Sequence, residues 1–308
     1  MSRTISALFI GGIVICLLGA ICFSTKAIFV KLAYRDTTVD AVTLLALRML
    51  FALPFFVVSA WYSSNQKSNV RFTRVQWLRV AVVGCLGYYV SSLLDFLGLQ
   101  YVTAGIERLI LFIYPTIVLL VSALFFRSSI SLRQWLALSV TYAGLFIAFW
   151  GEVDIQGSSS EFYKGALLIF VCAITFALYI VGSGRLIPSL GAAKFNSYAM
   201  SFAAVAVLIH FLINSDNSLF DQSSTTYIYS FCMAVVSTVI PSYLITEGIK
   251  RVGADNAAIV GSIGPVSTIV QAYFFLQEPL HLLQLLGTAC ILFGILMITG
   301  RKQVVAAR

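Results

Sequence analysis

Charge is scarce in this sequence. Charged residues make up 10% of the 308 positions and hydrophobic residues 60%, whereas soluble domains carry roughly 25% charged residues. This scarcity excludes an ordinary soluble domain, because a helix of about 20 apolar residues crosses the hydrocarbon core of a bilayer and such stretches follow one another along the chain. The composition therefore predicts an all-α integral membrane protein embedded in a lipid bilayer.

Metal-binding and redox patterns are also missing. His210 and His281 lie far apart without Glu or Cys partners at ligand spacing, and the six cysteines form no CxxC pair. We expect no metal and no cofactor, and we interpret the cysteines as small core residues. The net charge of +8 comes from Lys and Arg in short connections, which orient a membrane protein. We therefore expect no nucleic-acid partner.

Polar breaks divide the chain into ten predicted transmembrane helices. They are expected at residues 7–30, 41–61, 77–99, 104–126, 134–150, 165–187, 197–213, 227–248, 257–276 and 282–298. Lys and Arg gather in the N-terminal tail and in every second connection, while the alternate connections collect Asp and Glu. By the positive-inside rule, this bias predicts a multi-pass protein of the cell (inner) membrane with both termini in the cytoplasm.

The chain contains one unit twice. Subtracting 150 from six positions of the C-terminal part gives the same residue types earlier in the chain: Val252, Pro265, Phe275, Leu282, Gln284 and Gly294 correspond to Val102, Pro115, Phe125, Leu132, Gln134 and Gly144. A repeat of five helices starts its second copy on the opposite membrane face. We therefore predict two inverted five-helix repeats, residues 1–151 and 152–308, an organisation that many secondary transporters share.

The end of the second copy is similar to a known family. The similarity rests on Pro265, Phe274-Phe275, Glu278-Pro279, Leu286-Gly287 and Gly294-Ile295. These residues resemble the close of an EamA-type domain of the drug/metabolite transporter superfamily. The first copy departs from the pattern, with Ser128 in place of Glu278 and Ala137 in place of Gly287. The resemblance implies transport of a solute, often outward, and no catalytic residues.

Apart from Lys, Arg, Asp and Glu residues within two positions of a span end, five charged residues fall inside the predicted spans, all in the outer half: Lys26, Arg48, Asp95, Glu107 and Arg108. Each costs roughly 2.5–3.5 kcal/mol at mid-helix, so these side chains should be paired or should face water. On the third span, Tyr88, Ser92 and Asp95 share one helix face. This face either lines a wet cavity or holds Asp95 as the buried counter-ion of Arg48 or Lys26.

Glu107 and Arg108 are neighbours in the chain. On an ideal helix they point about 100° apart, so we predict that they do not pair with each other. Either could face the cavity, and we favour Glu107 for function. Asp95 and Glu107 are the candidate proton-coupling residues, because burial and nearby cations act in opposite directions on a membrane carboxylate.

The second copy lacks these charges. This difference predicts that the inner half of the cavity is neutral and that Tyr179 is its largest side chain. The alternative for Tyr179 is simple core packing. Hydroxyl stripes and small residues predict a cavity between the third, fourth, eighth and ninth helices. The candidate substrate-binding residues are Lys26, Arg48, Tyr88, Ser92, Asp95, Glu107, Tyr179, Ser242 and Gln271.

The function predicted from the sequence is secondary transport by alternating access. The expected solute is a small organic metabolite such as an amino acid, zwitterionic or anionic because three cations accompany two carboxylates, with export and coupling to protons as further expectations. The alternatives are an integral membrane enzyme acting on a lipid-linked substrate and a membrane regulator without transport. The sequence leaves open whether the protein is a monomer or a homodimer.

Topology can be tested with reporter fusions. Reporters at Asn69, Arg185 and Arg308 should report the cytoplasm, and reporters at Ser158 and Asn217 the outside, because the basic residues lie on the first set of connections. Enzymatic and fluorescent reporters with opposite compartment requirements provide the measurement. A cytoplasmic signal at Ser158 would contradict the inverted repeat.

Overall fold

The structure, a computed structural model, describes residues 2–66, 71–126, 130–156, 160–215, 217–277 and 282–299. Within these ranges every regular element is a helix. The elements are α1 (Ser2–Asp36), α2 (Ala41–Ser64), α3 (Arg74–Gly84), α4 (Ser91–Gly98), α5 (Ala104–Leu111), α6 (Tyr114–Phe126), α7 (Leu132–Gln156), α8 (Ser160–Leu190), α9 (Ala192–Asn214), α10 (Ser224–Ala234), α11 (Ile240–Val252), α12 (Ala254–Val260), α13 (Ile263–Gln271) and α14 (Leu282–Thr299). Residues used above that lie outside the described ranges are Asn69, Ser128, Ser158, Glu278, Pro279, His281 and Arg308.

Seven described segments are long and apolar enough to cross a membrane: Leu8–Asp36, Ala41–Ser64, Arg74–Gly98, Ser160–Leu190, Ala192–Asn214, Ser224–Val252 and Ala254–Leu276. Tyr114–Phe126 and Leu285–Gly294 are shorter apolar helices. These segments make the chain a multi-pass membrane protein. The count of ten spans and their inverted arrangement stay predictions.

Helix starts in the connections are fixed by capping side chains. Asp40 Oδ1 accepts hydrogen bonds from the amides of Val42 (2.9 Å) and Thr43 (3.0 Å) at the start of α2. Thr73 and Gln76 form a reciprocal capping box at the start of α3. These bonds satisfy amide groups that have no partner inside a helix, so each connection ends at a defined residue.

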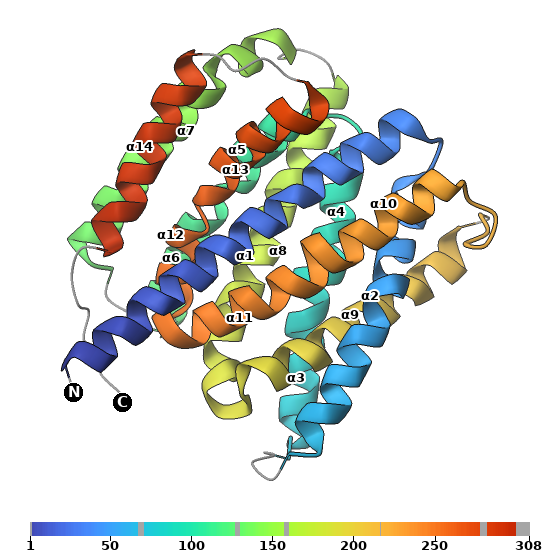
Figure 1. The fold of residues 1–308 in the computed structure, drawn as a ribbon, viewed down its shortest axis with the longest axis horizontal. Helices are drawn as coiled ribbons and strands as arrows, with labels where there is room; N and C mark the ends of the chain where they lie inside the picture. Colours follow the sequence, from blue (N-terminus) through green and yellow to red (C-terminus); the bar gives the residue numbers. More distant parts are fainter. Residues whose placement is uncertain are drawn as a thin grey trace.

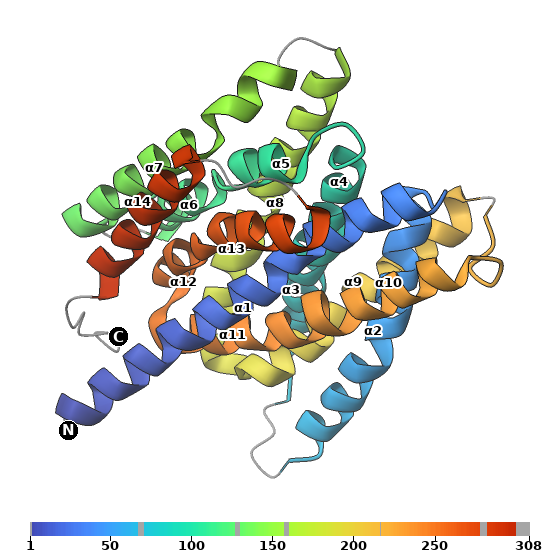
Figure 2. The ribbon, with the colours of Figure 1, turned by 45° about the horizontal axis from the view of Figure 1, so that its top comes forward.

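Pairs of helices that are distant in sequence pack side by side. Figures 1 and 2 show α7 and α14 together along one edge, α2 beside α9 at the other, and α1 running next to α11 through the middle. α8 lies behind α1 and packs against α4. Every one of these pairs joins a segment before residue 157 to a segment after residue 159, so the two parts of the chain form one intertwined bundle.

Two helices are broken at their centres, which the sequence analysis did not predict. The expected span 104–126 divides into α5 and α6 at Phe112–Ile113, and the expected span 257–276 divides into α12 and α13 at Gly261–Ser262. Pro115 follows the first break by two residues, and Pro265 follows the second by three. Proline has no amide hydrogen and its ring clashes with the carbonyl four residues earlier, which accounts for both breaks.

Two π-helical turns interrupt the long helices between α3 and α4 and between α10 and α11. They span Cys85–Val90 and Val235–Val239, and their first residues differ by the repeat offset of 150. Such turns shift the phase of the helix, so residues after the turn face a different neighbour than an ideal helix would give them. Sequence periodicity alone does not reveal this shift.

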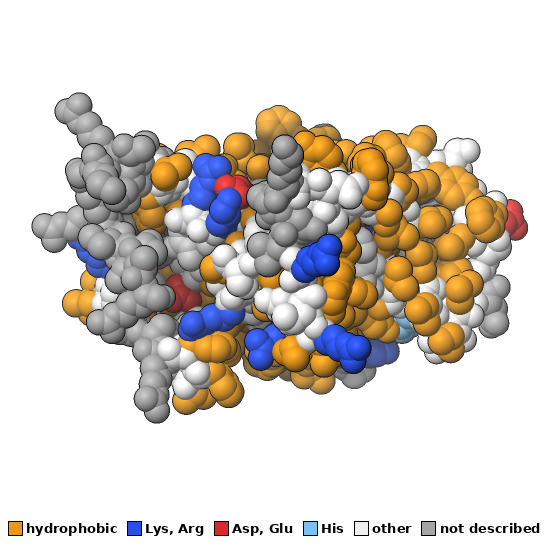
Figure 3. Space-filling model, turned by 90° about the horizontal axis from the view of Figure 1, so that it is seen from below, with side chains coloured by type: hydrophobic (Ala, Val, Ile, Leu, Met, Phe, Trp, Pro, Cys, Tyr) orange, Lys and Arg blue, Asp and Glu red, His pale blue; other side chains and the backbone are white. Residues whose placement is uncertain are grey.

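One face of the molecule carries several basic side chains and few acidic ones. Figure 3 shows this face from below the view of Figure 1, with wide hydrophobic areas beside the basic side chains. The ends of α8 and α11 and the start of α3 point toward it in Figure 1. This distribution agrees with the predicted cytoplasmic side, while the orientation itself stays a prediction.

The contact between α7 and α14 depends on glycine. A Cβ atom at Gly144 would lie 2.6 Å from the Gly287 carbonyl oxygen and 2.8 Å from Cys290 Cβ. Gly144→Ala should therefore push the helices apart and lower the free energy of unfolding by roughly 1–3 kcal/mol. The measurement is the thermal midpoint of the purified protein in detergent.

Gly11→Ala is the matched control for this change. Its added Cβ would meet only Arg251 Nη1, at an ordinary 3.5 Å. The control should melt at or above the wild-type temperature, because alanine favours a helix over glycine. Equal midpoints for the two variants would contradict the close packing of α7 on α14.

Candidate functional site

Four charged side chains form a buried ionic cluster, defined here as Lys26, Asp95, Glu107 and Arg108. Lys26 Nζ lies 2.6 Å from Asp95 Oδ2 and 4.0 Å from Glu107 Oε1, and Arg108 Nε lies 3.0 Å from Glu107 Oε2. All four side chains are at most 6% exposed. Positive and negative charges alternate, so the cluster is neutral as a whole and ties α1, α4 and α5 together.

The prediction that Glu107 and Arg108 do not pair is wrong. Their backbone directions do diverge on α5, whose start is capped by Thr103 accepting from the Ile106 amide at 3.2 Å. The arginine side chain is nevertheless long enough to bend back, and its guanidinium reaches the neighbouring carboxylate. The 100° rule describes where a side chain leaves the helix and does not limit where a long side chain ends.

The structure also shows which cation pairs with Asp95. The sequence left Lys26 and Arg48 as alternatives, and Lys26 forms the ion pair at 2.6 Å. Breaking such a buried pair by removing one member is strongly destabilising, because the remaining charge stays without compensation. The pair therefore fixes α1 to α4 at the level of this cluster.

Arg48, on α2, lies apart from the ionic cluster. Its Nε donates a hydrogen bond to Thr238 Oγ1 at 2.6 Å, and its guanidinium stands 5.5 Å from the centre of the Phe96 ring. The side chain is fully buried. Among the described residues, Nη1 and Nη2 have no hydrogen-bond partner, and no carboxylate forms an ion pair with Arg48.

Tyr88 and Tyr179 meet in a buried aromatic group. Their rings pack edge to face with centroids 5.0 Å apart, and the Tyr179 ring stacks on Phe176 at 5.9 Å. Gly87 allows this approach, because a Cβ there would collide with the Tyr179 ring. Tyr179 thus contacts a residue of the third predicted span directly, and both hydroxyl-bearing rings lie inside the bundle.

The remaining candidates are held by hydrogen bonds to their surroundings or are simply buried. Ser242 Oγ accepts from Asn196 Nδ2 at 3.0 Å and donates to the Val239 carbonyl at 2.8 Å. Gln271 Nε2 donates to Ser267 Oγ at 2.7 Å, and Ser92 is 5% exposed. These polar side chains bridge or fill helix contacts.

A cavity of about 50 Å³ lies between the two parts of the chain. One water molecule needs roughly 10–15 Å³ of such volume, so the cavity has room for a few waters. α1, α5, α6, α8, α11, α12 and α13 line it, with Phe23, Phe112, Tyr114 and Phe176 as the aromatic part of the wall. None of the nine candidate substrate-binding residues lines this cavity, which borders the first and sixth predicted helices instead of the third.

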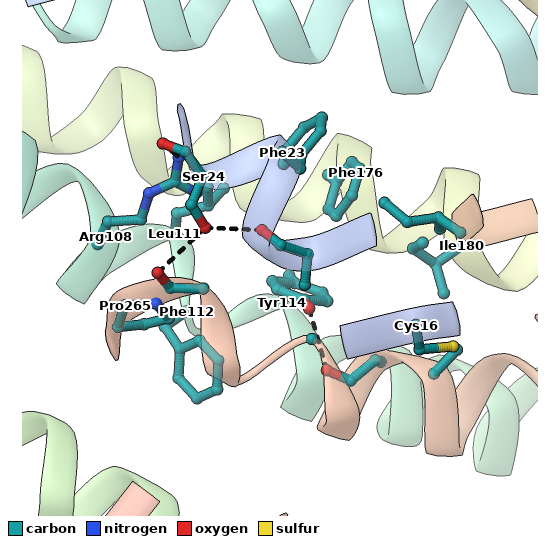
Figure 4. A pocket seen from close by; sticks show the side chains of 16 residues that line it. Cys16, Phe23, Ser24, Arg108, Leu111, Phe112, Tyr114, Phe176, Ile180 and Pro265 are labelled. Atoms are coloured by element: carbon teal, nitrogen blue, oxygen red, sulfur yellow. Dashed lines mark hydrogen bonds between the residues drawn. The ribbon is translucent and has the colours of Figure 1, made fainter. Parts of the chain in front are cut away.

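Polar groups are few in this cavity. Figure 4 shows Arg108 beside Ser24 at one end and Cys16 at the other. The Ser24 hydroxyl has one proton and lies 2.7 Å from the Ala20 carbonyl and 3.1 Å from the Gly264 carbonyl. The Tyr114 hydroxyl donates to the Ala258 carbonyl at 3.0 Å. Among the described residues that line the cavity, Arg108 is the one that carries a charge. Arg108 is therefore the member of the ionic cluster that faces the cavity, and Glu107 lies behind it.

Both helix breaks face this cavity, and this position was missed by the sequence analysis. Leu111, Phe112 and Tyr114 line it from the first break, and Gly261 and Gly264 from the second. Mid-span prolines at corresponding places in the two copies were the available signal, because broken helices near the midplane commonly form the solute site of transporters.

Comparison with known proteins gives consistent results. A model of the EamA-like transporter family matches residues 10–150 and again residues 163–300. The uncharacterized transporter YcbK of Bacillus subtilis (strain 168) is 32% identical over 300 residues, covering 94% of this chain and 93% of YcbK. The uncharacterized transporter sll1319 of Synechocystis is 24% identical, covering 97% and 96%. A crystal structure of 17% identity shares the fold with a TM-score of 0.74, covering 94% of this chain and 96% of its own.

The ionic cluster yields a stability prediction. Asp95→Asn removes the partner of Lys26 and should lower the free energy of unfolding by roughly 3–5 kcal/mol, since it leaves a buried ammonium uncompensated. Adding Lys26→Gln should restore part of this loss. Thermal midpoints of the purified single and double variants provide the measurement.

Arg48→Gln combined with Asp95→Asn is the matched control, because it removes a cation that forms no ion pair with Asp95. It should restore less stability than Lys26→Gln does. Equal rescue by the two second changes would show that the pairing of Asp95 with Lys26 does not govern stability.

Proposed function

Because the chain belongs to the EamA-like transporter family, we propose that it is a secondary transporter of the cell (inner) membrane. It carries a small organic metabolite, such as an amino acid, outward by alternating access, and both termini lie in the cytoplasm. The relatives named as transporters support this class over an enzyme. The observation that carries the proposal is the cavity, which lies between the two copies and is flanked by a broken helix from each.

The two copies, residues 1–151 and 152–308, form ten helices in two inverted repeats in this proposal. The contact of α7 with α14 supports it. Gly144 approaches the Gly287 carbonyl, and Gly294 approaches the Ala137 carbonyl, where an added Cβ would lie 2.6 Å and 2.8 Å away. Adding 150 to Gly144 gives Gly294, and subtracting 150 from Gly287 gives Ala137, so the two contacts are equivalent positions of the repeat. A two-fold axis between the halves requires such a pair of equivalent contacts.

A second pair of contacts supports the same axis at the other end of each half. A Cβ on Gly12 would lie 2.7 Å from Val252, and a Cβ on Gly165 would lie 2.9 Å from Val102. Gly12 corresponds to Gly165 at an offset of 153, which applies to the first helix of each copy, and Val102 corresponds to Val252 at the offset of 150. The first helix of each half therefore packs on the third span of the other half through the same small residue.

In this mechanism the ionic cluster closes the predicted outer route, and its carboxylates take part in proton coupling. Asp95 and Glu107 are fully buried and share Lys26 as a neighbour, at 2.6 Å and 4.0 Å. A proton on either carboxylate cancels its attraction for the cations and loosens α1 from α4 or α5. While the ionic cluster is intact, solute enters the cavity from the cytoplasmic side.

Efflux from proteoliposomes tests the proposal. Liposomes containing the purified protein are loaded with a defined mixture of amino acids, organic acids, nucleosides and sugars, and released solutes are measured by mass spectrometry. At least one solute should leave several times faster than from protein-free liposomes, and an imposed pH gradient should increase its release. If no solute leaves faster, the transport function is rejected.

The double variant Asp95→Asn with Lys26→Gln separates transport from coupling. Because it keeps the cluster neutral but removes a proton site, it should exchange the solute at a measurable rate without responding to the pH gradient. Retained gradient-driven release would remove Asp95 from the proton path.

A further inference from the structure

Five charged side chains are buried in the predicted outer half, and their charges do not balance. The ionic cluster contains two cations and two carboxylates and is neutral by itself. Arg48 is the fifth, fully buried and always protonated. One positive charge therefore remains without a compensating carboxylate in the described part of the chain, and Arg48 carries it.

The surroundings of Arg48 orient its guanidinium. Thr238 holds Nε at 2.6 Å, and Phe96 lies against the group with its ring centre 5.5 Å away. These two contacts do not involve the edge of the guanidinium formed by Nη1 and Nη2. Neither of these atoms has a hydrogen-bond partner among the described residues. This edge presents two parallel N–H donors, the geometry that binds the two oxygens of a carboxylate.

No carboxylate in the described ranges fills this position. Asp95 is near enough to act on the charge of Arg48, but its side chain is engaged by Lys26 at 2.6 Å. Water could accept the two hydrogen bonds and still leave the positive charge uncompensated in a poorly solvated place. An anion meets both requirements, because it accepts the hydrogen bonds and balances the charge.

We propose that Arg48 binds the anionic group of the transported solute, so that the substrate is an organic anion or a zwitterion with a free carboxylate. This inference rests on the proposed transport function and specifies its substrate class. Aromatic rings connect the position to the cavity: Tyr88 is near Arg48, packs on Tyr179 at 5.0 Å, and Tyr179 stacks on the cavity-lining Phe176. Tyr88 and Tyr179 are fully buried between Arg48 and the cavity, so these rings must move apart for the solute to reach Arg48.

Thermal midpoints of the full-length protein in lipid nanodiscs test the inference. The probes are acetate, butyrate and phenylacetate, each compared with its neutral amide at constant ionic strength. At least one acid should raise the midpoint of the wild type while its amide, which has the same shape, has little effect. Arg48→Gln should weaken the apparent affinity for that acid by on the order of tenfold to a hundredfold, the range expected for a charge-assisted pair.

Two further variants keep the guanidinium or its charge. Arg48→Lys retains the charge without the fork and should bind the acid about tenfold more weakly, and Thr238→Val should weaken it severalfold by releasing Nε. If Arg48→Gln fails to fold, these two variants carry the test. Arg35→Gln is the matched control, because Arg35 is an exposed arginine at the end of α1, and it should respond like the wild type.

The inference is overturned if acids and amides act alike on the wild type, if no acid raises the midpoint, or if Arg48→Gln keeps the preference for the acid. The efflux experiment distinguishes this failure from failure of the proposed function. Release of a neutral solute together with any of these results leaves transport standing and removes the anion site. Absence of release for every solute rejects transport itself.

Discussion

The ion pair between Lys26 and Asp95 is the interaction on which the arrangement around the cavity depends. The hydrocarbon core of the bilayer cannot solvate such charges, so they must be paired or face water inside the protein. The pair holds α1 against α4, and Glu107 with Arg108 continues the alternation onto α5. Phe23 and Ser24 come just before Lys26 in α1 and line the cavity, as Arg108 does from α5. The cluster therefore sets the position of two cavity walls at once.

Proline-induced breaks provide the second constraint. An unbroken helix satisfies all its backbone groups internally, whereas a break leaves carbonyls that need other donors. Near the cavity, the hydroxyls of Tyr114 and Ser24 bond to the carbonyls of Ala258 and Gly264. These bonds link the α5–α6 side and α1 to the broken helix of the second copy. The Tyr114 hydroxyl therefore satisfies a carbonyl beside the second break and also supplies one of the few polar atoms in an otherwise apolar cavity.

Much of the helical architecture could be predicted from the sequence, because apolar length and polar breaks directly reflect the bilayer. The burial of the five charged residues followed from the same reasoning. The choice of Lys26 over Arg48 as the partner of Asp95 could not be predicted, since it depends on how α1, α2 and α4 pack in three dimensions. The cavity borders the fourth, eighth and ninth predicted helices, as the sequence indicated, but the first and sixth helices line it in place of the third. A hydroxyl stripe is not specific for a cavity wall, because it is equally typical of residues that bond to neighbouring helices, as Ser242 does with Asn196.

The two sides of the bundle are closed by different chemistry. Toward the predicted cytoplasmic face, some contacts between helices are neutral: Ser197 Oγ donates to Ser59 Oγ at 2.9 Å and lies 2.9 Å from the Tyr243 hydroxyl. Charged groups there contact neutral partners on other helices, as Asp255 does with Ser122 at 2.8 Å and Arg185 with the Phe126 ring at 4.0 Å. Opening there exchanges neutral hydrogen bonds for bonds to water, at a net cost of roughly 0.5–1.5 kcal/mol each. Separating the buried charges of the outer cluster costs several kcal/mol per ion unless a proton or a charged solute replaces the lost partner. In the proposed transport cycle, we infer that outward opening is conditional on such a replacement, whereas the ion pairs described at the predicted cytoplasmic face lie within α11 and stay intact when helices separate.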